Sequence, residues 1–479
     1  MAAVRRPARF RPAFLLFSAV GALVGCALKQ PPSNNQVAAE ALPAAKLPPG
    51  WKAAPVDTTP VVHGWLATLG DSALLALVTE ALEQNADLRL AAARVDAATG
   101  QLRLASSRLY PAVDLVGHGG IGSGGDGSGL NAVLVRAEWE ADLWGRVRYG
   151  RAAARAGQGA ASADLVYAQQ SLAGLVAKSW YLITELRMQA RLAAAMAGAS
   201  AQLLQLVGVE RNVGTANDED VALARADAGT YRDRELQLKQ STGEAVRALE
   251  VLLGRYPAGT LAVRDSLPPE VPAVPAGLPS SLIARRPDLA AASQRVASAF
   301  YARRQAVAAK LPAFNLNGSF GAINSEVLAL QADFSNPVAS LGASLLAPIF
   351  HAGGLQAQVD IRTAEQRQAV ATYGAAVLAA FQDVENALAA EQVLSQRQSI
   401  LTQVVGEQTR AVAVTQTRYR VGKSDLLAVL QQRVRLYGAE ATLLGVRTDR
   451  IVQRINLHLA LGGDFVTPAD SASAVPGGR

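Results

Sequence analysis

Cysteine, aromatic residues and long hydrophobic runs are scarce in this chain, and each scarcity excludes a class of protein. One cysteine, Cys26, occurs in 479 residues, so the chain cannot form an internal disulfide. Aromatic residues make up 5% of the composition although 50% of the residues are hydrophobic. Alanine supplies much of the hydrophobic share, and this favours helices that pack closely through small side chains.

The usual signs of catalysis, metal binding and nucleic-acid binding are also missing. Four histidines, at His63, His118, His351 and His458, show no metal-ligand spacing, and no Gly-x-Ser-x-Gly motif occurs. We therefore predict no catalytic residue, no metal and no enzyme, and we expect His458 to serve packing or to place charge at a helix end. The formal net charge of +7 is too small to predict nucleic-acid binding, since four of those charges belong to arginines in the first eleven residues.

Two glycine motifs resemble nucleotide-binding loops but have the wrong surroundings. Gly422-Lys423-Ser424 lacks the glycine that a phosphate-binding loop needs five residues before Gly422, where Thr417 stands, and a helical pattern precedes it. The stretch "GGIGSGGDGSG" contains a Gly-x-Gly-x-x-Gly match, but a strand pattern follows it where a dinucleotide site needs a helix. We interpret the first motif as a turn between helices and the second as a loop tip.

The N-terminus carries a targeting signal. Residues 1–25 contain four arginines, the apolar stretch "AFLLFSAVGALVG", and small residues immediately before Cys26. This pattern resembles the lipobox of bacterial lipoproteins, which implies cleavage before Cys26 and a covalent lipid on that residue. The alternative is an incidental thiol in an ordinary signal peptide. Ala27, where many inner-membrane lipoproteins have aspartate, favours the outer membrane.

The sequence contains an internal duplication of about 200 residues. Motifs such as "RLYPAVDL" at 108–115 and "AKLPAFNL" at 309–316 recur at an offset of about 200 residues. The predicted domains are a lipidated N-terminal segment at 26–64, repeats at 65–265 and 280–463, a proline-rich linker at 266–279 and a tail at 464–479. No later stretch reaches about 18 unbroken apolar residues, so a membrane crossing would require β-strands.

Each repeat has the same predicted plan. A helix at 71–109, or 280–310 in the second copy, ends before a proline, and two strand candidates follow it. A proline-free helical segment then runs from 146 to 212, or 353 to 419, and a helix returns over 217–253 or 424–461. The returning helix is about half as long as the outgoing one, so the first helix stacked on its end would complete the pairing. Gly214 and Gly422 would terminate the outgoing helices, and Asn217 or Asp218, and Ser424 or Asp425, would cap the returning ones.

This combination resembles NodT-type outer-membrane efflux lipoproteins of the TolC superfamily. Stretches such as "LVTEALEQNADLRLAAARVDAA", "WEADLWGRVR" and "GLPSSLIARRPDLAAASQRV", with the two Val-Gly turns, carry the resemblance from Cys26 to Gly463. It implies an α+β membrane protein, with four strands per chain in a trimeric twelve-stranded β-barrel. That barrel would continue into a long periplasmic α-helical barrel of coiled-coil hairpins.

The resemblance also implies a function, partners and sites. The implied protein is the outer-membrane channel of a tripartite efflux system, which passively conducts substrates from a periplasmic adaptor and an inner-membrane pump of the RND or MFS type. The family's adaptor contacts map to the hairpin tips, at Val213, Gly214, Thr215, Val421, Gly422, Lys423 and Ser424. The alternative function is a soluble coiled-coil lipoprotein that acts as an adaptor or structural protein. Neither the cargo nor the pump class is predicted.

We expect the inner aperture of the tunnel to be less acidic in this chain than is usual in the family. Asp220 matches the acidic position in the first repeat, whereas the two corresponding positions in the second are Ala428 and Gln431. The acid there is limited to Asp425, one turn before Ala428. Either these aspartates supply the charge of the aperture or they only cap helices. The aromatics Tyr110, Trp139, Trp144 and Phe350 lie near strand ends and would either form membrane-interface belts or fill the junction with the helices.

Overall fold

The computed structural model describes residues 28–44, 48–53, 64–118, 130–269, 273–275, 277, 279–325, 331–332 and 337–464. These residues form two compact units that cut across both repeats. One unit contains Met1–Pro43, Arg94–Ser162 and Ala291–Gly374, and the other contains the remaining three segments. The signal peptide, Cys26, the 119–129 loop tip, parts of the predicted linker and the tail beyond residue 464 lie outside the described residues.

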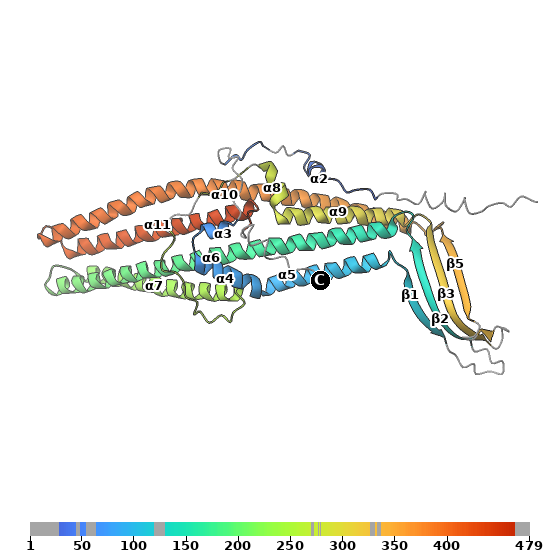
Figure 1. The fold of residues 1–479 in the computed structure, drawn as a ribbon. Helices are drawn as coiled ribbons and strands as arrows, with labels where there is room; N and C mark the ends of the chain where they lie inside the picture. The colour runs from blue at the N-terminus through green and yellow to red at the C-terminus, as the bar shows by residue number, and fades with distance from the viewer. Residues whose placement is uncertain are drawn as a thin grey trace, which may run out of the picture. The chain divides into compact units, whose positions relative to one another are not determined.

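The first unit contains an antiparallel sheet, whose four long strands lie side by side in Figure 1. They are β1 (Ala112–His118), β2 (Leu130–Ala141), β3 (Ala313–Ser325) and β5 (Val338–Leu346), and β4 (Gln331–Ala332) adds a two-residue pairing with β3. The spatial order of the long strands is β1-β2-β3-β5, so the strand pairs of the two repeats join through β2 and β3. The four predicted strands are confirmed.

The helices of the two repeats match closely. The outgoing helices α6 (Arg146–Asn212) and α10 (Gly354–Arg420) have 67 residues each, and the returning helices α7 (Asp218–Leu252) and α11 (Leu426–Ala460) have 35 each. Their predicted bounds are correct to within two residues. The described residues also form two short helices that the sequence did not predict, α2 (Asn34–Ala41) and α3 (Trp65–Thr68).

The first helix of each repeat is broken, which corrects the prediction of one continuous helix. The structure has α4 (Ser72–Gln84) and α5 (Ala86–Ser107) in the first copy, and α8 (Pro279–Arg285) and α9 (Pro287–Ala308) in the second. Asn85 interrupts the first copy because its side-chain oxygen accepts hydrogen bonds from the N–H groups of Asp87 and Leu88, as a helix cap does. In the second copy Pro287 disfavours helix at Arg286.

Both breaks lie against the end of a returning helix. The Asn85 amide donates to the carbonyl of Leu252 at 3.0 Å, and the Arg286 guanidinium donates to the carbonyl of Ala460 at 3.2 Å. Two different side chains therefore satisfy the free carbonyls at the ends of α7 and α11. These contacts confirm the predicted end-to-end stacking in both repeats.

The main hydrophobic core of the second unit gathers side chains from α3, α4, α6, α7 and α11. Trp65, Leu74, Trp180, Leu249 and Ile455 are at most 2% exposed. Among the described helices only α6 is long and apolar enough to cross a membrane. Its middle contributes Trp180 and Ile183 to this core, so we attribute its apolar composition to packing.

Candidate functional site

The sheet has one face that is apolar on all four long strands. Neighbouring residues of a strand point to opposite faces, and directly paired residues share a face, so the strand register determines the composition of each face. Leu115 pairs with Val135, Val135 with Phe320, and Phe320 with Ala339. The full set on this face is Val113, Leu115, Gly117, Val133, Val135, Ala137, Trp139, Ala141, Phe314, Leu316, Gly318, Phe320, Ala322, Ala339, Leu341, Ala343 and Leu345.

Many of these apolar side chains are exposed, with Leu341 91% and Leu115 73% accessible. A continuous exposed apolar face of this kind is unfavourable in water and suits contact with lipid. The sequence showed only imperfect alternation within β2. The apolar face becomes recognisable when the strand register aligns the apolar positions of all four long strands.

The opposite face of the sheet is mixed and carries the polar groups. Arg136 forms an ion pair with Glu138 on the same strand, and the hydroxyls of Ser319 and Ser340 are 2.7 Å apart across β3 and β5. Further polar residues on this face are Asp114, Glu140, Asn315, Asn317 and Ser344. Their alternation in "AFNLNGSF" was readable from the sequence, but their alignment with the charges on β2 was not. This face suits water.

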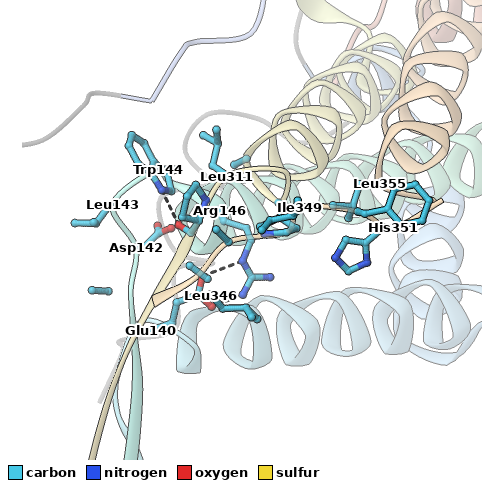
Figure 2. A pocket seen from close by; sticks show the side chains of 18 residues that line it. Glu140, Asp142, Leu143, Trp144, Arg146, Leu311, Leu346, Ile349, His351 and Leu355 are labelled. Carbon is cyan, nitrogen blue, oxygen red and sulfur yellow. Dashed lines mark hydrogen bonds and ion pairs between the residues drawn. The ribbon is translucent and has the colours of Figure 1, made fainter. Parts of the chain in front are cut away.

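The end of the sheet where β2 and β5 terminate meets the helices at a cavity of about 500 Å³, shown in Figure 2. Trp144 donates from its indole N–H to the carbonyl of Pro312 at 2.8 Å, and Arg146 pairs with Glu140. Trp139 likewise donates to the carbonyl of Leu109 at 3.0 Å. The two tryptophans therefore fasten the junction, whereas Tyr110 and Phe350 are 71% and 85% exposed. A belt role stays a prediction for all four aromatics, since Trp139 and Trp144 are also 36% and 46% exposed.

The first hairpin tip, between α6 and α7, is a glycine turn with a strong cap. Gly214 has a φ of +82°, and the Thr215 N–H reaches back to the Glu210 carbonyl at 2.9 Å, which closes the end of α6. Asn217 caps α7, because its side-chain oxygen accepts from the Asp220 N–H at 2.9 Å. The Asp220 carboxylate in turn accepts from the Asn217 N–H at 3.0 Å. Asp218 instead forms an ion pair with Arg211.

The second tip, between α10 and α11, repeats this geometry with other side chains. Gly422 has a φ of +67°, and the Lys423 N–H donates to the Arg418 carbonyl at 2.8 Å. Asp425, not Ser424, caps α11 by accepting from the Ala428 N–H at 2.7 Å. The Gly-Lys-Ser stretch thus turns between two helices, as predicted.

The predicted contact residues gather at these two turns. Val213 and Val421 are 70% and 62% exposed, which is high for apolar side chains. Asp220 in the first turn of α7, Asp425 at the N-cap of α11 and Gln431 in its second turn are all exposed. Both aspartates make capping hydrogen bonds, and a carboxylate can do so while it keeps its charge. Their role in an aperture therefore stays a prediction.

A small apolar cluster holds the two hairpins together near their tips. Leu203 and Val207 of α6 pack with Ala224 of α7 and Leu430 of α11, and Leu430 is 1% exposed. Between α10 and α11, Glu391 accepts hydrogen bonds from Arg450 at 3.0 Å and from Arg454 at 2.8 Å. The apolar cluster supports the tips without covering their exposed valines, and the Glu391 contacts join α10 and α11 farther from the turn.

Known proteins of the same plan match most of this chain. The family model described as outer membrane efflux protein matches residues 77–255 and 278–463. The pyoverdine export outer membrane protein OpmQ of Pseudomonas aeruginosa is 30% identical over 422 residues, which cover 84% of this chain and 88% of that protein. The toluene efflux pump outer membrane protein TtgC of Pseudomonas putida is 28% identical, over 91% of this chain and 92% of its own.

A solved structure shows the same fold. The outer-membrane channel OprN superposes with a TM-score of 0.79 at 25% identity, and the match covers 92% of this chain and 99% of that one. Together these matches confirm the resemblance, the predicted channel fold, the efflux function and the outer-membrane location. The chain belongs to the outer membrane efflux protein family.

Proposed function

We propose that three copies of this chain close into one barrel and form the passive exit duct of a tripartite efflux system. The observation that carries this proposal is the apolar face shared by β1, β2, β3 and β5, together with the outer edges of β1 and β5. In the described chain, each of these two strands pairs on one side only. Inside a bilayer, free strand edges leave backbone groups without hydrogen bonds, which costs several kcal/mol for each group.

Closure between copies removes both edges. Consecutive strands of the sheet alternate in direction, so β5 of one copy and β1 of the next would run antiparallel. Four long strands from each of three copies give the twelve-stranded barrel that the family resemblance implies. The polar face would then line a water-filled lumen, and the apolar face would contact lipid.

The hairpin tips are the proposed contact with a periplasmic adaptor. Val213 and Val421 expose apolar surface at the turns, and Thr215 and Lys423 follow the two glycines. An exposed apolar residue beside backbone turns suits docking against a partner helix. The adaptor and an inner-membrane pump of the RND or MFS type would supply the substrate and the energy. We further propose that Cys26 carries the lipid that anchors the chain.

The cargo is not assigned. The names of the two relatives refer to pyoverdine and toluene, which differ strongly in size and polarity. Such variety within one fold fits a duct whose pump selects the substrate.

Matched arginine substitutions on neighbouring residues of β5 test the proposal. Leu341 lies on the apolar face and Ser340 on the polar face. Leu341→Arg should strongly reduce assembly in the outer membrane, since an arginine near the bilayer midplane costs about 2–4 kcal/mol. Ser340→Arg should assemble and shift the ion selectivity of single channels towards anions. Equal assembly of both variants would contradict the assignment of the two faces.

A further inference from the structure

A basic groove lies beside the start of α6 in the first unit. Its cavity measures about 710 Å³, and its lining includes Arg148, Arg151 and Arg155 of α6 together with Leu28, Pro31 and Pro32 of the N-terminal segment. None of the described residues that line it is an aspartate or a glutamate. The Arg148 guanidinium donates a hydrogen bond to the Asp142 carboxylate at 3.1 Å. Arg151 and Arg155 are exposed and make no hydrogen bond or ion pair with any residue that the structure describes.

The N-terminal segment forms the other wall of the groove and is held against α6 and α9. The Lys29 N–H donates to the Tyr149 hydroxyl at 3.2 Å, and the Tyr301 hydroxyl bonds to Gln30. The rings of Tyr149 and Tyr301 lie 6.4 Å apart beneath this segment. The groove therefore combines an apolar wall of leucine and prolines with two guanidinium groups that have no partner among the described residues.

Two independent features place the groove at the periplasmic surface of the bilayer. β2 ends at Ala141 and α6 begins at Arg146, so Arg151 and Arg155 lie about 8 and 14 Å along the helix from its start. Helix side chains tilt towards the N-terminus of their helix, which here directs both arginines back towards the strand end. Leu28 follows the proposed lipid-bearing Cys26 by two residues, or about 7 Å of extended chain.

The lipid anchor also indicates whether the groove lies on the outside of the barrel or in its lumen. Acyl chains on Cys26 can enter the bilayer only from outside a closed barrel, so the wall formed by Leu28 must face outwards. The groove then faces the headgroups of the inner leaflet rather than the lumen.

The second repeat lacks these charges. The equal lengths of α6 and α10 align Arg148, Arg151 and Arg155 with Gln356, Val359 and Thr363. The arginine stripe is therefore not a requirement of the shared helical plan. It occurs on the outgoing helix that lines the groove together with Leu28, Pro31 and Pro32.

We propose that this groove binds the headgroup phosphate of an anionic phospholipid in the inner leaflet of the outer membrane. Arg151 and Arg155 would hold the phosphate oxygens, and Leu28, Pro31 and Pro32 would contact the glycerol backbone. The proposal rests on the membrane placement in the proposed function. It adds a specific lipid to the covalent anchor as a second attachment.

The test is a lipid titration of the purified, acylated, full-length protein in detergent, followed by native mass spectrometry. Phosphatidylglycerol should bind the wild type more tightly than phosphatidylcholine with the same acyl chains. The Arg151→Gln/Arg155→Gln variant should bind phosphatidylglycerol about 30-fold more weakly. The matched control is Arg225→Gln/Arg435→Gln, which removes two exposed arginines from α7 and α11 and should leave lipid binding unchanged.

Three outcomes would overturn the proposal. They are equal phosphatidylglycerol binding by the groove variant, no preference over phosphatidylcholine, and displacement of the lipid by millimolar inorganic phosphate. Rising salt should weaken phosphatidylglycerol binding to the wild type, which tests the charge interaction without any variant. Single-channel conductance of the wild type reports separately on the proposed function, so failure of the lipid site and failure of the channel are distinguishable.

Discussion

His458 lies on α11 with its ring stacked on Trp65, at 5.5 Å between ring centres. It is 6% exposed, and its Nδ1 has no hydrogen-bond partner among the described residues. Burial, helped by the nearby positive charge of Arg454, lowers its pKa from 6.5 to about 4. The expectation of packing is therefore confirmed, and the alternative of a positive charge at the helix end is wrong near neutral pH.

The lowered pKa of His458 predicts that the stability of the folded protein depends on pH. A folded pKa below the unfolded value means that only the unfolded chain gains the proton between pH 6.5 and about 4. Stability is therefore fully present above pH 6.5 and falls as the pH drops through that window, by about 3 kcal/mol. His458→Phe keeps the ring stacking and should flatten this part of the profile in thermal unfolding. His351→Phe, at an exposed site, serves as the control, and an unaltered slope in His458→Phe would refute the assignment.

Asparagine substitutions of Asp220 and Asp425 distinguish a role in helix capping from a role in the charge of the aperture. Asparagine caps helices as well as aspartate does, and its side-chain oxygen can still accept the bonds seen at both tips. Asp220→Asn/Asp425→Asn should therefore fold normally and weaken the block of single channels by multivalent cations. Asp233→Asn, farther along α7, is the control. If the double variant is blocked as strongly as the wild type, the aspartates act only as caps.

At the scale of elements, glycines of the same conformation terminate four helices under different constraints. Gly422 has a φ of +67° and no atom within 4 Å of the position that a Cβ would take. Gly462, at the end of α11, has a φ of +68°, and its Cβ would lie 3.1 Å from the Arg285 carbonyl oxygen. Gly214 and Gly254 form the corresponding pair in the first repeat, with Gly254 facing the Gln84 backbone. The tips are thus free, and the stacked joints are tightly packed.

Alanine substitutions should distinguish the glycines at the free tips from those at the packed joints. Gly422→Ala should lower the stability by about 1–2 kcal/mol, the cost of a left-handed conformation alone. Gly462→Ala should lower it by about 2–5 kcal/mol, because the Arg285 backbone must also move. The measurement is the thermal unfolding temperature of each purified variant. A larger loss in Gly422→Ala would show that the end-to-end contact is not tight.

Most elements were predictable from the sequence because prolines, glycines and the repeat mark their ends. Pro111, Pro312, Gly214 and Gly422 lie next to the observed boundaries. The break at Asn85 was missed because asparagine occurs inside helices as well as at their caps. Its capping bonds to Asp87 and Leu88 and its bond to the Leu252 carbonyl appear only in the structure. Arg286 could have been recognised as a break, since Pro287 follows it.

At the scale of the whole molecule, duplication explains the architecture but not the sites. The two repeats share helix lengths and turns, yet they differ at the tips, at the joints and along the first turns of α6 and α10. The faces of the sheet could not be assigned from single strands, because Ala132 and Leu134 interrupt the polar pattern of β2. Only the pairing of four strands from both repeats distinguishes them.

Closure of the strand edges between copies is the central claim, and cysteine crosslinking tests it most directly. One cysteine replaces Val113 or Leu115 on β1, and a second replaces Leu341, Ala343 or Leu345 on β5, in protein oxidised within intact outer membranes. The account predicts that at least one pair yields covalent species of two and three copies and none larger, while single-cysteine variants give no three-copy band. Monomers for every pair, or a ladder that continues past three copies, would contradict it.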